Sequence, residues 1–320
     1  MKMLDPNPTR FENATKTALY LRRTHENMKI ARIETVDGNR CWALVDPEAG
    51  TARRLQGGFR EWASSAALGN MDLPLEAATL QLSQVRLLAP IEPGARILAV
   101  GMNYLAHLTH LGVKEAPAHT IGFIKPDSGV LDPDSEIRYP VTTAQLDFEI
   151  EMVAVVAREF GDEPQASACL LGYTIGNDIS ARDAGKQLGV MDLFGQKALD
   201  GTAPIGPWVT TLDEFGGAGQ PEVDITMRIN GEVRQHDNTR NMIFKIDEIL
   251  NYVDIRIALR PGDILFTGTT CGVAFQDGRY LQPGDRLESE IERIGVLRNT
   301  IGPKRQPMPS RLTGRLGLPI

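Results

Sequence analysis

Short apolar blocks, each bounded by Gly, Pro, Asn or Asp, fill most of the chain between residues 93 and 302. Such blocks predict β-strands, whereas helical spacing in this range is confined to residues 180–189 and 241–253. The pattern therefore predicts a β-rich barrel or sandwich of mixed sheets. The predicted strands lie in RILAVG (96–101), TIGFIKP (120–126), FEIEMVAVVA (148–157), LLGYTIGN (170–177), PIGPWVTT (204–211), VDITMRING (223–231), DILFTGTT (263–270) and RLESEIERIG (286–295).

The part of the chain before residue 93 has a different pattern. Two apolar runs in residues 28–50 meet at Asp37-Gly38, a typical hairpin turn, and residues 59–70 have helical spacing. We therefore expect a small α+β N-terminal domain over residues 28–92 and a larger domain over residues 93–303. Residues 1–27 form an N-terminal extension, and residues 304–320 form a basic C-terminal tail.

Composition narrows the class of protein. The 320 residues are 42% hydrophobic, which allows a large core, and their formal net charge of -7 comes without a basic cluster. This balance argues against binding to nucleic acid or to an anionic membrane. The three cysteines are scattered and predict neither a disulfide framework nor a zinc site. The chain shows neither an apolar leader nor a run of transmembrane length, so we expect a cytoplasmic protein.

One predicted strand carries unusual charges. Asp147, Glu149 and Glu151 alternate with apolar residues, so they point to one face, and a uniformly apolar run follows them. Carboxylates beside a core strand are costly unless a cation neutralises them. Asp178 follows the end of the next apolar strand, just before a helix that we expect to begin at Ser180. Glu149, Glu151 and Asp178 would supply oxygen ligands for a hard divalent cation such as Mg²⁺.

Acidic and apolar residues also alternate on strands that face solvent and bind no metal. The chain contains such a candidate in Glu288, Glu290 and Glu292, where no buried run follows. Spacing alone therefore leaves the metal site and the solvated strand as alternatives. The pairing of the first acidic run with the segment NDISARD (177–183) favours the metal site.

Taken together, several segments resemble the fumarylacetoacetate hydrolase family over about residues 95–301. The resemblance rests on NYLAH (103–107), DFEIE (147–151), NDISARD (177–183), KALDGTAPIGP (197–207) and PGDILFTGTTCGV (261–273), in that order. It implies an α+β, β-rich fold, the mixed β-sandwich roll of the family's C-terminal domain, here with a small α+β N-terminal domain. It also implies a homodimer, a bound Mg²⁺ or Mn²⁺ (or Ca²⁺ in a crystal), and a small 2-oxo acid as substrate.

The same resemblance assigns roles. Glu149, Glu151 and Asp178 match the family's metal ligands, and Asp147 is a supporting acid on the same face. His107 matches the residue that activates water, a task that suits imidazole because it titrates near pH 7. A hydrogen-bonded loop histidine is the alternative interpretation of His107.

Other matched positions are expected to contact substrate. Arg182 lies four residues after Asp178, one turn along the expected helix, and its planar fork suits a carboxylate; the alternative is a surface ion pair with Asp183. Lys197 and Arg182 are both expected to act in catalysis and to bind substrate. The remaining expected substrate contacts are Tyr104, Lys125 and Thr269, and an ordinary hairpin turn is the alternative for Thr269.

Two positions depart from the family pattern. His110 stands where the family often has an acid that pairs with the histidine at 107, so standard activation of water is in doubt. Gly185 stands where the family often has a glutamine, and Gln187 lies two residues further on. A contact that selects substrate is therefore missing or shifted.

These observations favour a metal-dependent hydrolase that cleaves a C–C bond of an acylpyruvate-like 1,3-dioxo acid through a stabilised enolate. The alternative is an isomerase, decarboxylase or hydratase that acts on a 2-oxo acid or diacid in aromatic or sugar-acid catabolism. His110 raises the weight of this alternative. A metal-stabilised binding module without catalytic activity is a third interpretation, against which the retention of His107, Arg182 and Lys197 argues.

Overall fold

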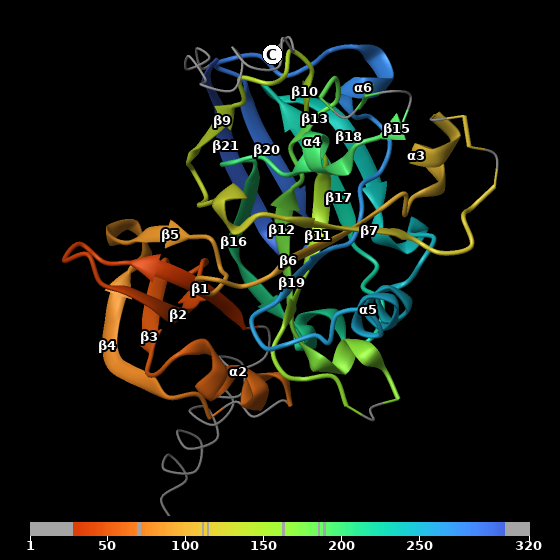
Figure 1. Cartoon of the computed structure of the whole chain (residues 1–320). Helices are drawn as coiled ribbons and strands as arrows, with labels where there is room; N and C mark the ends of the chain where they lie inside the picture. The colour runs from red at the N-terminus through yellow and green to blue at the C-terminus, as the bar shows by residue number, and fades with distance from the viewer. Residues whose placement is uncertain are drawn as a thin grey trace, which may run out of the picture.

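The computed structural model describes residues 28–68, 72–110, 112–113, 115–161, 164–184, 186–187 and 190–304. The expected extension over residues 1–27, all of the expected tail except residue 304, and Gly185 lie outside the described residues. Figure 1 shows the chain from the red N-terminal strands to the blue C-terminal ones.

A twelve-stranded sheet runs through the molecule in the order β4-β3-β2-β1-β16-β12-β11-β19-β6-β7, with β5 paired to β1 and β8 paired to β16. The N-terminal strands β1 to β4 continue the same sheet through the antiparallel pair of β1 with β16. Its strands are β1 (Lys29–Glu34), β2 (Arg40–Asp46), β3 (Thr51–Leu55), β4 (Leu75–Gln81), β5 (Arg86–Leu88), β6 (Ile97–Gly101), β7 (Ile121–Lys125), β8 (Val130–Leu131), β11 (Ile150–Val156), β12 (Leu170–Asn177), β16 (Ala203–Thr211) and β19 (Ile264–Phe266).

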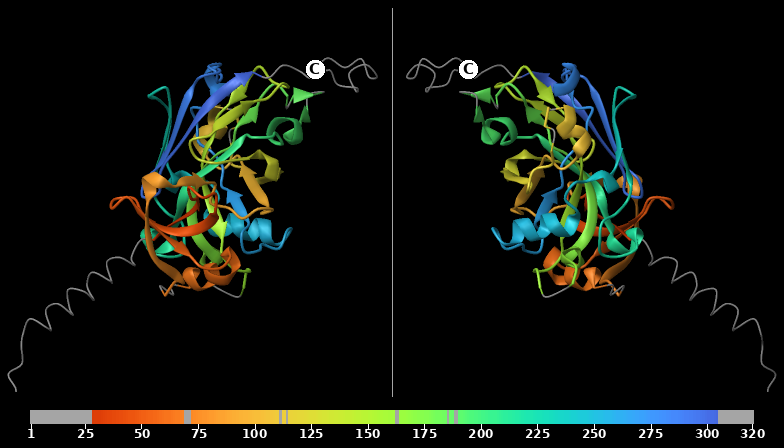
Figure 2. Two further views of the ribbon diagram at one scale, coloured as in Figure 1. Left: turned by 90° about the vertical axis from the view of Figure 1, so that its left-hand side faces the viewer. Right: turned by 90° about the vertical axis from the view of Figure 1, so that its right-hand side faces the viewer.

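A second sheet of five strands packs beside the first, in the order β18-β17-β20-β21-β9. The side views in Figure 2 show its blue strands as a separate layer. It consists of β9 (Glu136–Tyr139), β17 (Asp224–Ile229), β18 (Glu232–Asn238), β20 (Arg286–Ile291) and β21 (Gly295–Lys304). Two short ribbons complete the strands: β10 (Leu146–Asp147) with β13 (Ser180–Ala181), and β14 (Lys186–Gln187) with β15 (Val190–Met191).

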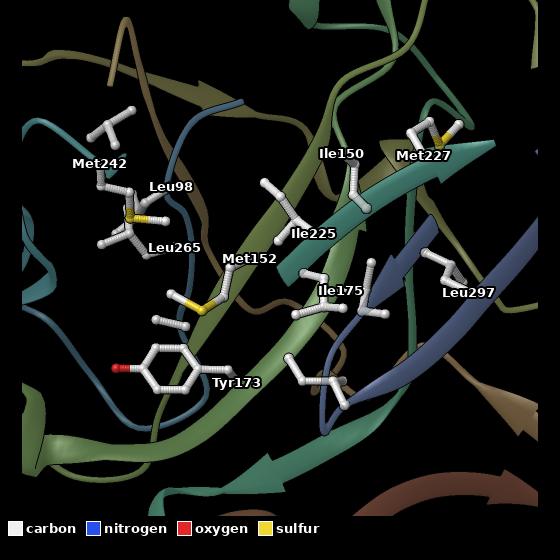
Figure 3. Close-up of a cluster of buried hydrophobic side chains, with 14 of the residues drawn as sticks. Leu98, Ile150, Met152, Tyr173, Ile175, Ile225, Met227, Met242, Leu265 and Leu297 are labelled. Atoms are coloured by element: carbon white, nitrogen blue, oxygen red, sulfur yellow. The ribbon is translucent and has the colours of Figure 1, made fainter. Parts of the chain in front are cut away.

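The main core fills the space between the two sheets. Ile150 and Met152 of β11 and Ile175 of β12 meet Ile225 and Met227 of β17, and all five side chains are buried (Figure 3). Alternating residues of each strand supply this layer, as expected for sheets that pack face to face. The core therefore fixes β11 and β12, the two strands that carry the acidic residues.

Helices are short and lie at the edges of the sheets. In α5, Ile246, Ile249, Leu250 and Val253 are buried at the spacing of one helical face, which packs this helix onto the main core. The α-helices are α2 (Phe59–Ala67), α3 (Leu105–His110), α4 (Leu193–Lys197), α5 (Ile246–Asp254) and α6 (Ala274–Asp277). The 3₁₀ turns are η1 (Leu82–Gln84), η2 (Asp127–Gly129), η3 (Ala166–Cys169), η4 (Leu212–Phe215) and η5 (Thr239–Asn241). None of the helices in the described residues has the length and apolarity needed to cross a bilayer.

The β-rich α+β fold predicted from the sequence is confirmed, including the hairpin at Asp37-Gly38, the helix after residue 58, and strands in all eight apolar blocks. The predicted helix from Ser180 is wrong. Ser180 and Ala181 form β13, which pairs with β10, and the Arg182 N–H donates to the carbonyl of Gln145 at 3.0 Å. Pairing with a distant segment thus overrides the local helical pattern.

Candidate active site

Two neighbouring strands bring three carboxylates together. Glu149 lies just before β11, Glu151 lies within it, and Asp178 follows the last residue of β12. Because β11 and β12 are antiparallel with Ile150 opposite Asn177, the Asp178 N–H donates to the Glu149 carbonyl at 2.9 Å. One oxygen from each of the three carboxylates lies within 4.8 Å of the others, and all three residues are buried.

Two buried lysines pair with carboxylates of this cluster. Lys197, at the end of α4, donates from Nζ to a Glu149 oxygen, an Asp178 oxygen and Ser180 Oγ, each at 2.6 Å. Lys125, at the end of β7, donates to the other Asp178 oxygen at 2.6 Å. Buried carboxylates are tolerated only when they are paired and hydrogen-bonded in this way.

Arg182 joins the cluster from the turn that follows β13. Its Nε donates to Asp147 at 2.7 Å, and its Nη2 donates to Glu149. Asp147 also accepts the backbone N–H groups of Ala274 at 2.6 Å and Phe275 at 3.0 Å, at the start of α6. Asp147 therefore holds Arg182 and α6 in place, and Arg182 retains Nη1 without a hydrogen-bond acceptor among the described residues.

Burial and neighbouring charges shift the pKa values of Glu149 and Glu151 in opposite directions. Burial alone would raise the pKa of Glu149, but Arg182 and Lys197 outweigh it and hold that pKa well below its ordinary value. Burial, together with the negative charges of Asp178 and Glu149, raises the pKa of Glu151 well above its ordinary value. Burial also lowers the pKa of Lys125, an effect that Asp178 opposes.

The donor set fits a hard divalent cation. Three carboxylates supply oxygen ligands from two rigid strands, and the crowding that raises the pKa of Glu151 is the kind that such a cation relieves. The Gly268 N–H holds the second Glu151 oxygen at 2.6 Å. Gly268 has a φ of +94°, and a Cβ there would lie 2.8 Å from the Cβ of Asn103, so the loop needs glycine to approach this closely.

A cavity of about 80 Å³ opens next to the carboxylates. Charged, polar and apolar side chains all line it. The charged and polar ones are His107, Glu149, Glu151, Asp178, Arg182, Gln196, Lys197 and Thr269. The apolar lining consists of Val100, Gly101, Met102, Ile121, Phe123, Met191 and Leu193, and Lys197 Nζ lies 5.4 Å from the centroid of the Phe123 ring.

His107 lies in α3 with 7% of its surface exposed. Its Nδ1 is buried and has no hydrogen-bond partner within the described part of the chain. Burial lowers the pKa of His107, and the nearby Arg182 and Lys197 lower it further, although Glu149 opposes them. His110 does not pair with it, because His110 is exposed and its ring Nδ1 lies 2.8 Å from the Ala106 carbonyl oxygen. His107 therefore lines the cavity, and its Nδ1 has no hydrogen-bond partner in the described part of the chain.

Thr269 lies in the loop after β19 and lines the cavity. Its hydroxyl donates to the Ile150 carbonyl at 2.8 Å and accepts from Gln235 Nε2 at 2.9 Å. Gln235, in β18, also accepts the Ile150 N–H at 3.1 Å, so it ties the Thr269 loop to β11. The sequence gives no signal for Gln235, because its role depends on the packing of the second sheet against the first.

Two predicted substrate contacts do not line the cavity. Lys125 is 1% exposed and lies behind Asp178, where it acts on the carboxylate instead. Tyr104 is fully buried in the main core, and within the described residues its hydroxyl has no hydrogen-bond partner. Neither side chain reaches the space beside His107 and Thr269.

Sequence reasoning also missed the apolar lining of the cavity. Met102, Ile121, Phe123, Met191 and Leu193 are apolar, and apolar residues normally indicate only a core. Met102 has a φ of 60°, a conformation that non-glycine residues rarely adopt and that is enriched at functional sites. No sequence pattern indicates this conformation in advance.

Fold and site together define a class: a β-rich protein with a buried carboxylate centre suited to a hard cation. Residues 96–302 match the family described as fumarylacetoacetate (FAA) hydrolase C-terminal, and residues 28–90 match that described as Rv2993c-like, N-terminal. The chain belongs to the fumarylacetoacetate hydrolase family, whose members are enzymes: isomerases, tautomerases and hydrolases.

Relatives within the family have different described activities. Protein Rv2993c of Mycobacterium tuberculosis is 34% identical over 88% of this chain and 100% of its own length. Oxaloacetate tautomerase Fahd2a of Rattus norvegicus, a mitochondrial protein, is 35% identical over 68% of this chain and 70% of its own length. The crystal structure of 2-hydroxyhepta-2,4-diene-1,7-dioate isomerase from Mycobacterium marinum is 31% identical, with a TM-score of 0.71 over 87% of this chain and 100% of its own.

Proposed function

We propose that this protein is a divalent-metal-dependent tautomerase or isomerase that moves a proton on a 2-oxo acid. The observation that carries the proposal is the buried Nδ1 of His107, which lacks a carboxylate partner among the described residues, on a residue that lines the cavity beside the carboxylates. Hydrolysis needs a base that activates water, and a carboxylate on the imidazole strengthens such a base. Without it, His107 is better suited to exchanging a proton with bound substrate.

The position of each residue in the site gives its role in the proposed reaction. Glu149, Glu151 and Asp178 would hold Mg²⁺ or Mn²⁺, which supplies a Lewis acid for the negative charge of an enolate. Arg182 Nη1 would bind the carboxylate of the substrate, since its other two nitrogens are fixed on Asp147 and Glu149.

Proton transfer itself falls to His107. In the keto-to-enol direction the C3–H bond breaks, the proton passes to the neutral imidazole, and the electron pair forms the C2–C3 double bond. The lowered pKa of His107 keeps the imidazole neutral near pH 7, as a base requires. Return of the proton to the oxygen gives the enol, and the reverse sequence gives the keto acid. The apolar lining of the cavity makes the site less favourable for water than a fully polar one.

The relatives support this choice without deciding it. One is described as an oxaloacetate tautomerase and another as a 2-hydroxyhepta-2,4-diene-1,7-dioate isomerase. Both descriptions name rearrangements of a 2-oxo acid or its enol and need no attack by water. The hydrolase expected from the sequence is the second candidate, since a water held on the free His107 nitrogen would serve cleavage of an acylpyruvate. We also propose that two copies of this protein form a homodimer.

Exchange of C3 protons for deuterium separates the two candidates. Purified protein with Mg²⁺ or Mn²⁺ is mixed with 2-oxopentanoate in deuterated water, and the C3 signal is followed by NMR. In parallel, acetylpyruvate is supplied, and release of pyruvate and acetate is measured. We expect exchange without cleavage. Cleavage of acetylpyruvate faster than exchange would favour the hydrolase, and neither reaction would refute both candidates.

Two histidine variants serve as the matched pair for this assay. His107→Gln should slow exchange by about 10² to 10⁴-fold, the usual contribution of a general base. His110→Gln should leave the rate within about twofold, because that side chain is exposed and bonded to its own helix. Equal effects of the two substitutions would remove His107 from the mechanism.

A further inference from the structure

Asn103 joins segments that lie far apart in the sequence. Its side chain is fully buried, and its Nδ2 donates to the carbonyl oxygens of Thr267 at 2.8 Å and Phe244 at 3.1 Å. Its Oδ1 accepts the Phe244 N–H at 2.7 Å, and its own backbone carbonyl accepts the Ile243 N–H at 2.8 Å. The N–H groups and the oxygen of this one buried amide therefore hold main-chain groups of two distant loops.

One of these loops supports the carboxylate centre. Thr267 precedes Gly268, whose N–H donates to a Glu151 oxygen at 2.6 Å. Asn103 also packs against Gly268, since a Cβ added to that glycine would lie 2.8 Å from the Asn103 Cβ. Asn103 therefore fixes the loop that orients Glu151.

In the chain itself, Asn103 stands just before the helix that carries His107. Helix α3 begins at Leu105, and Met102, which precedes Asn103, lines the cavity with a φ of 60°. Such a conformation persists only where the surroundings hold it, and the hydrogen bonds of Asn103 fix the adjacent backbone. The Nδ1 of His107 has no hydrogen-bond partner in the described part of the chain. No bond at that nitrogen orients the ring, so its placement depends on α3.

Resting on the proposed function, we propose that Asn103 is a positioning residue that holds the His107 imidazole at its place beside the carboxylate centre. Asn103 does not itself line the cavity, so it acts through Gly268 on one side and α3 on the other. A misplacement of about 1 Å costs about 10²-fold in rate when reacting groups must be aligned. Loss of the Asn103 amide should therefore slow proton exchange and leave binding of the 2-oxo acid nearly unchanged.

Asn299 provides a matched control. It is also buried, in β21, and its Nδ2 likewise donates to two main-chain carbonyls, those of Ser135 at 2.9 Å and Asp132 at 3.2 Å, but it does not line the cavity. In the C3 exchange assay, Asn103→Ala should lower kcat by about 10²-fold and leave KM within about twofold. Asn299→Ala should leave both within about twofold. Where circular dichroism shows that Asn103→Ala does not fold, Asn103→Asp replaces it, because Asp retains the volume of the side chain and the acceptor for Phe244.

Combination with His107→Gln separates positioning from general damage to the fold. If Asn103 acts through His107, Asn103→Ala should slow exchange by no more than about twofold further once the imidazole has been removed. A further loss of about 10²-fold in the His107→Gln background would overturn the proposal.

The imidazole signal of His107 gives a readout that does not depend on turnover. The protein is labelled with isotopically enriched histidine, and the NMR signal of His107 is identified by its absence from His107→Gln. We expect this signal to shift in Asn103→Ala but not in Asn299→Ala, while that of His236, in β18, stays unchanged in both. An unshifted His107 signal, or a shifted one with full exchange in a reaction that needs His107, would overturn the proposal. A shifted signal in a protein whose exchange does not depend on His107 would uphold the placement of His107 by Asn103 and refute the proposed function.

Discussion

Two strand regions of this protein carry acids at the same spacing, but one set of acids is buried in the candidate site and the other is exposed. Glu149 and Glu151, beside and within β11, are 5% and 2% exposed and converge with Asp178 on one point. The side chains of Glu288 and Glu290, in β20, are 37% and 44% exposed and lie apart from any such cluster in the described residues. Alternation of acids therefore does not by itself predict a metal centre.

The neighbouring strands account for the difference. β20 lies between β17 and β21, which place Arg228 and Arg298 beside its acids, at 2.5 Å from Glu290 and 3.1 Å from Glu288. These pairs are exposed and solvated, so each contributes little to stability. β11 lies between β12 and β19 in the main sheet, where Glu149 and Glu151 are buried and buried cations lie close by. The position of a strand in its sheet therefore decides whether acids at this spacing are buried together or exposed to solvent.

The largest expected contrast is in turnover. Glu149→Ala removes one of three candidate ligands and one of the two carboxylate partners of both Lys197 and Arg182, so we expect C3 proton exchange to fall by about 10³-fold, equivalent to about 4 kcal/mol. Glu290→Ala should leave the rate within about twofold. Circular dichroism would verify that both variants fold. A folded Glu149→Ala variant that keeps full activity would remove the carboxylate centre from the reaction.

Stability gives the second contrast. Lys125→Met removes a buried cation from Asp178 and should lower the free energy of unfolding by about 3 kcal/mol, since half of a buried ion pair is left. Arg298→Met breaks the exposed pair with Glu288 and should cost less than about 0.5 kcal/mol. Urea unfolding of both metal-free variants measures the two values. Similar losses would show that Lys125 is not the counter-charge of Asp178.

Much of this arrangement follows from local pattern. β11 and β12 are predictable because both are uninterrupted apolar runs of strand length, and Asp178 is predictable because it follows the second run. The family resemblance then identifies Lys197, whose distance from the acids along the chain gives no other clue. The structure brings these residues together because they lie in or next to regular elements that pair or pack with one another.

The remaining parts depend on contacts between distant segments. Arg182 was expected on a helix and instead lies in a turn, because β13 pairs with β10 and two buried carboxylates hold the guanidinium. Gln235 lies on the other sheet, beyond a register shift between Met227 and Arg228 that no local pattern specifies. Phe123 and the rest of the apolar lining resemble ordinary core residues in the sequence. Tertiary packing, rather than local preference, decides all of these.

Metal binding should be visible as stabilisation. A ligand that binds only the folded state at about 100 times its Kd adds about 2.7 kcal/mol. Mg²⁺ or Mn²⁺ should therefore raise the melting temperature of the wild type and of Glu290→Ala by several degrees, and a chelator should reverse the rise. Glu149→Ala should show little rise at the same concentration. An equal rise in both variants would place the ion elsewhere.

The smallest effect belongs to the exposed strand. A double-mutant cycle on Arg228→Met and Glu290→Gln should give a coupling of about 0.2 to 1 kcal/mol in urea unfolding, because both side chains remain partly solvated at 33% and 44% exposure. The coupling should shrink in about 1 M salt, where charges are screened within about 3 Å. A coupling of several kcal/mol that persists in salt would mean that β20 is buried by a partner in solution, and its acids would then need the same explanation as those of β11.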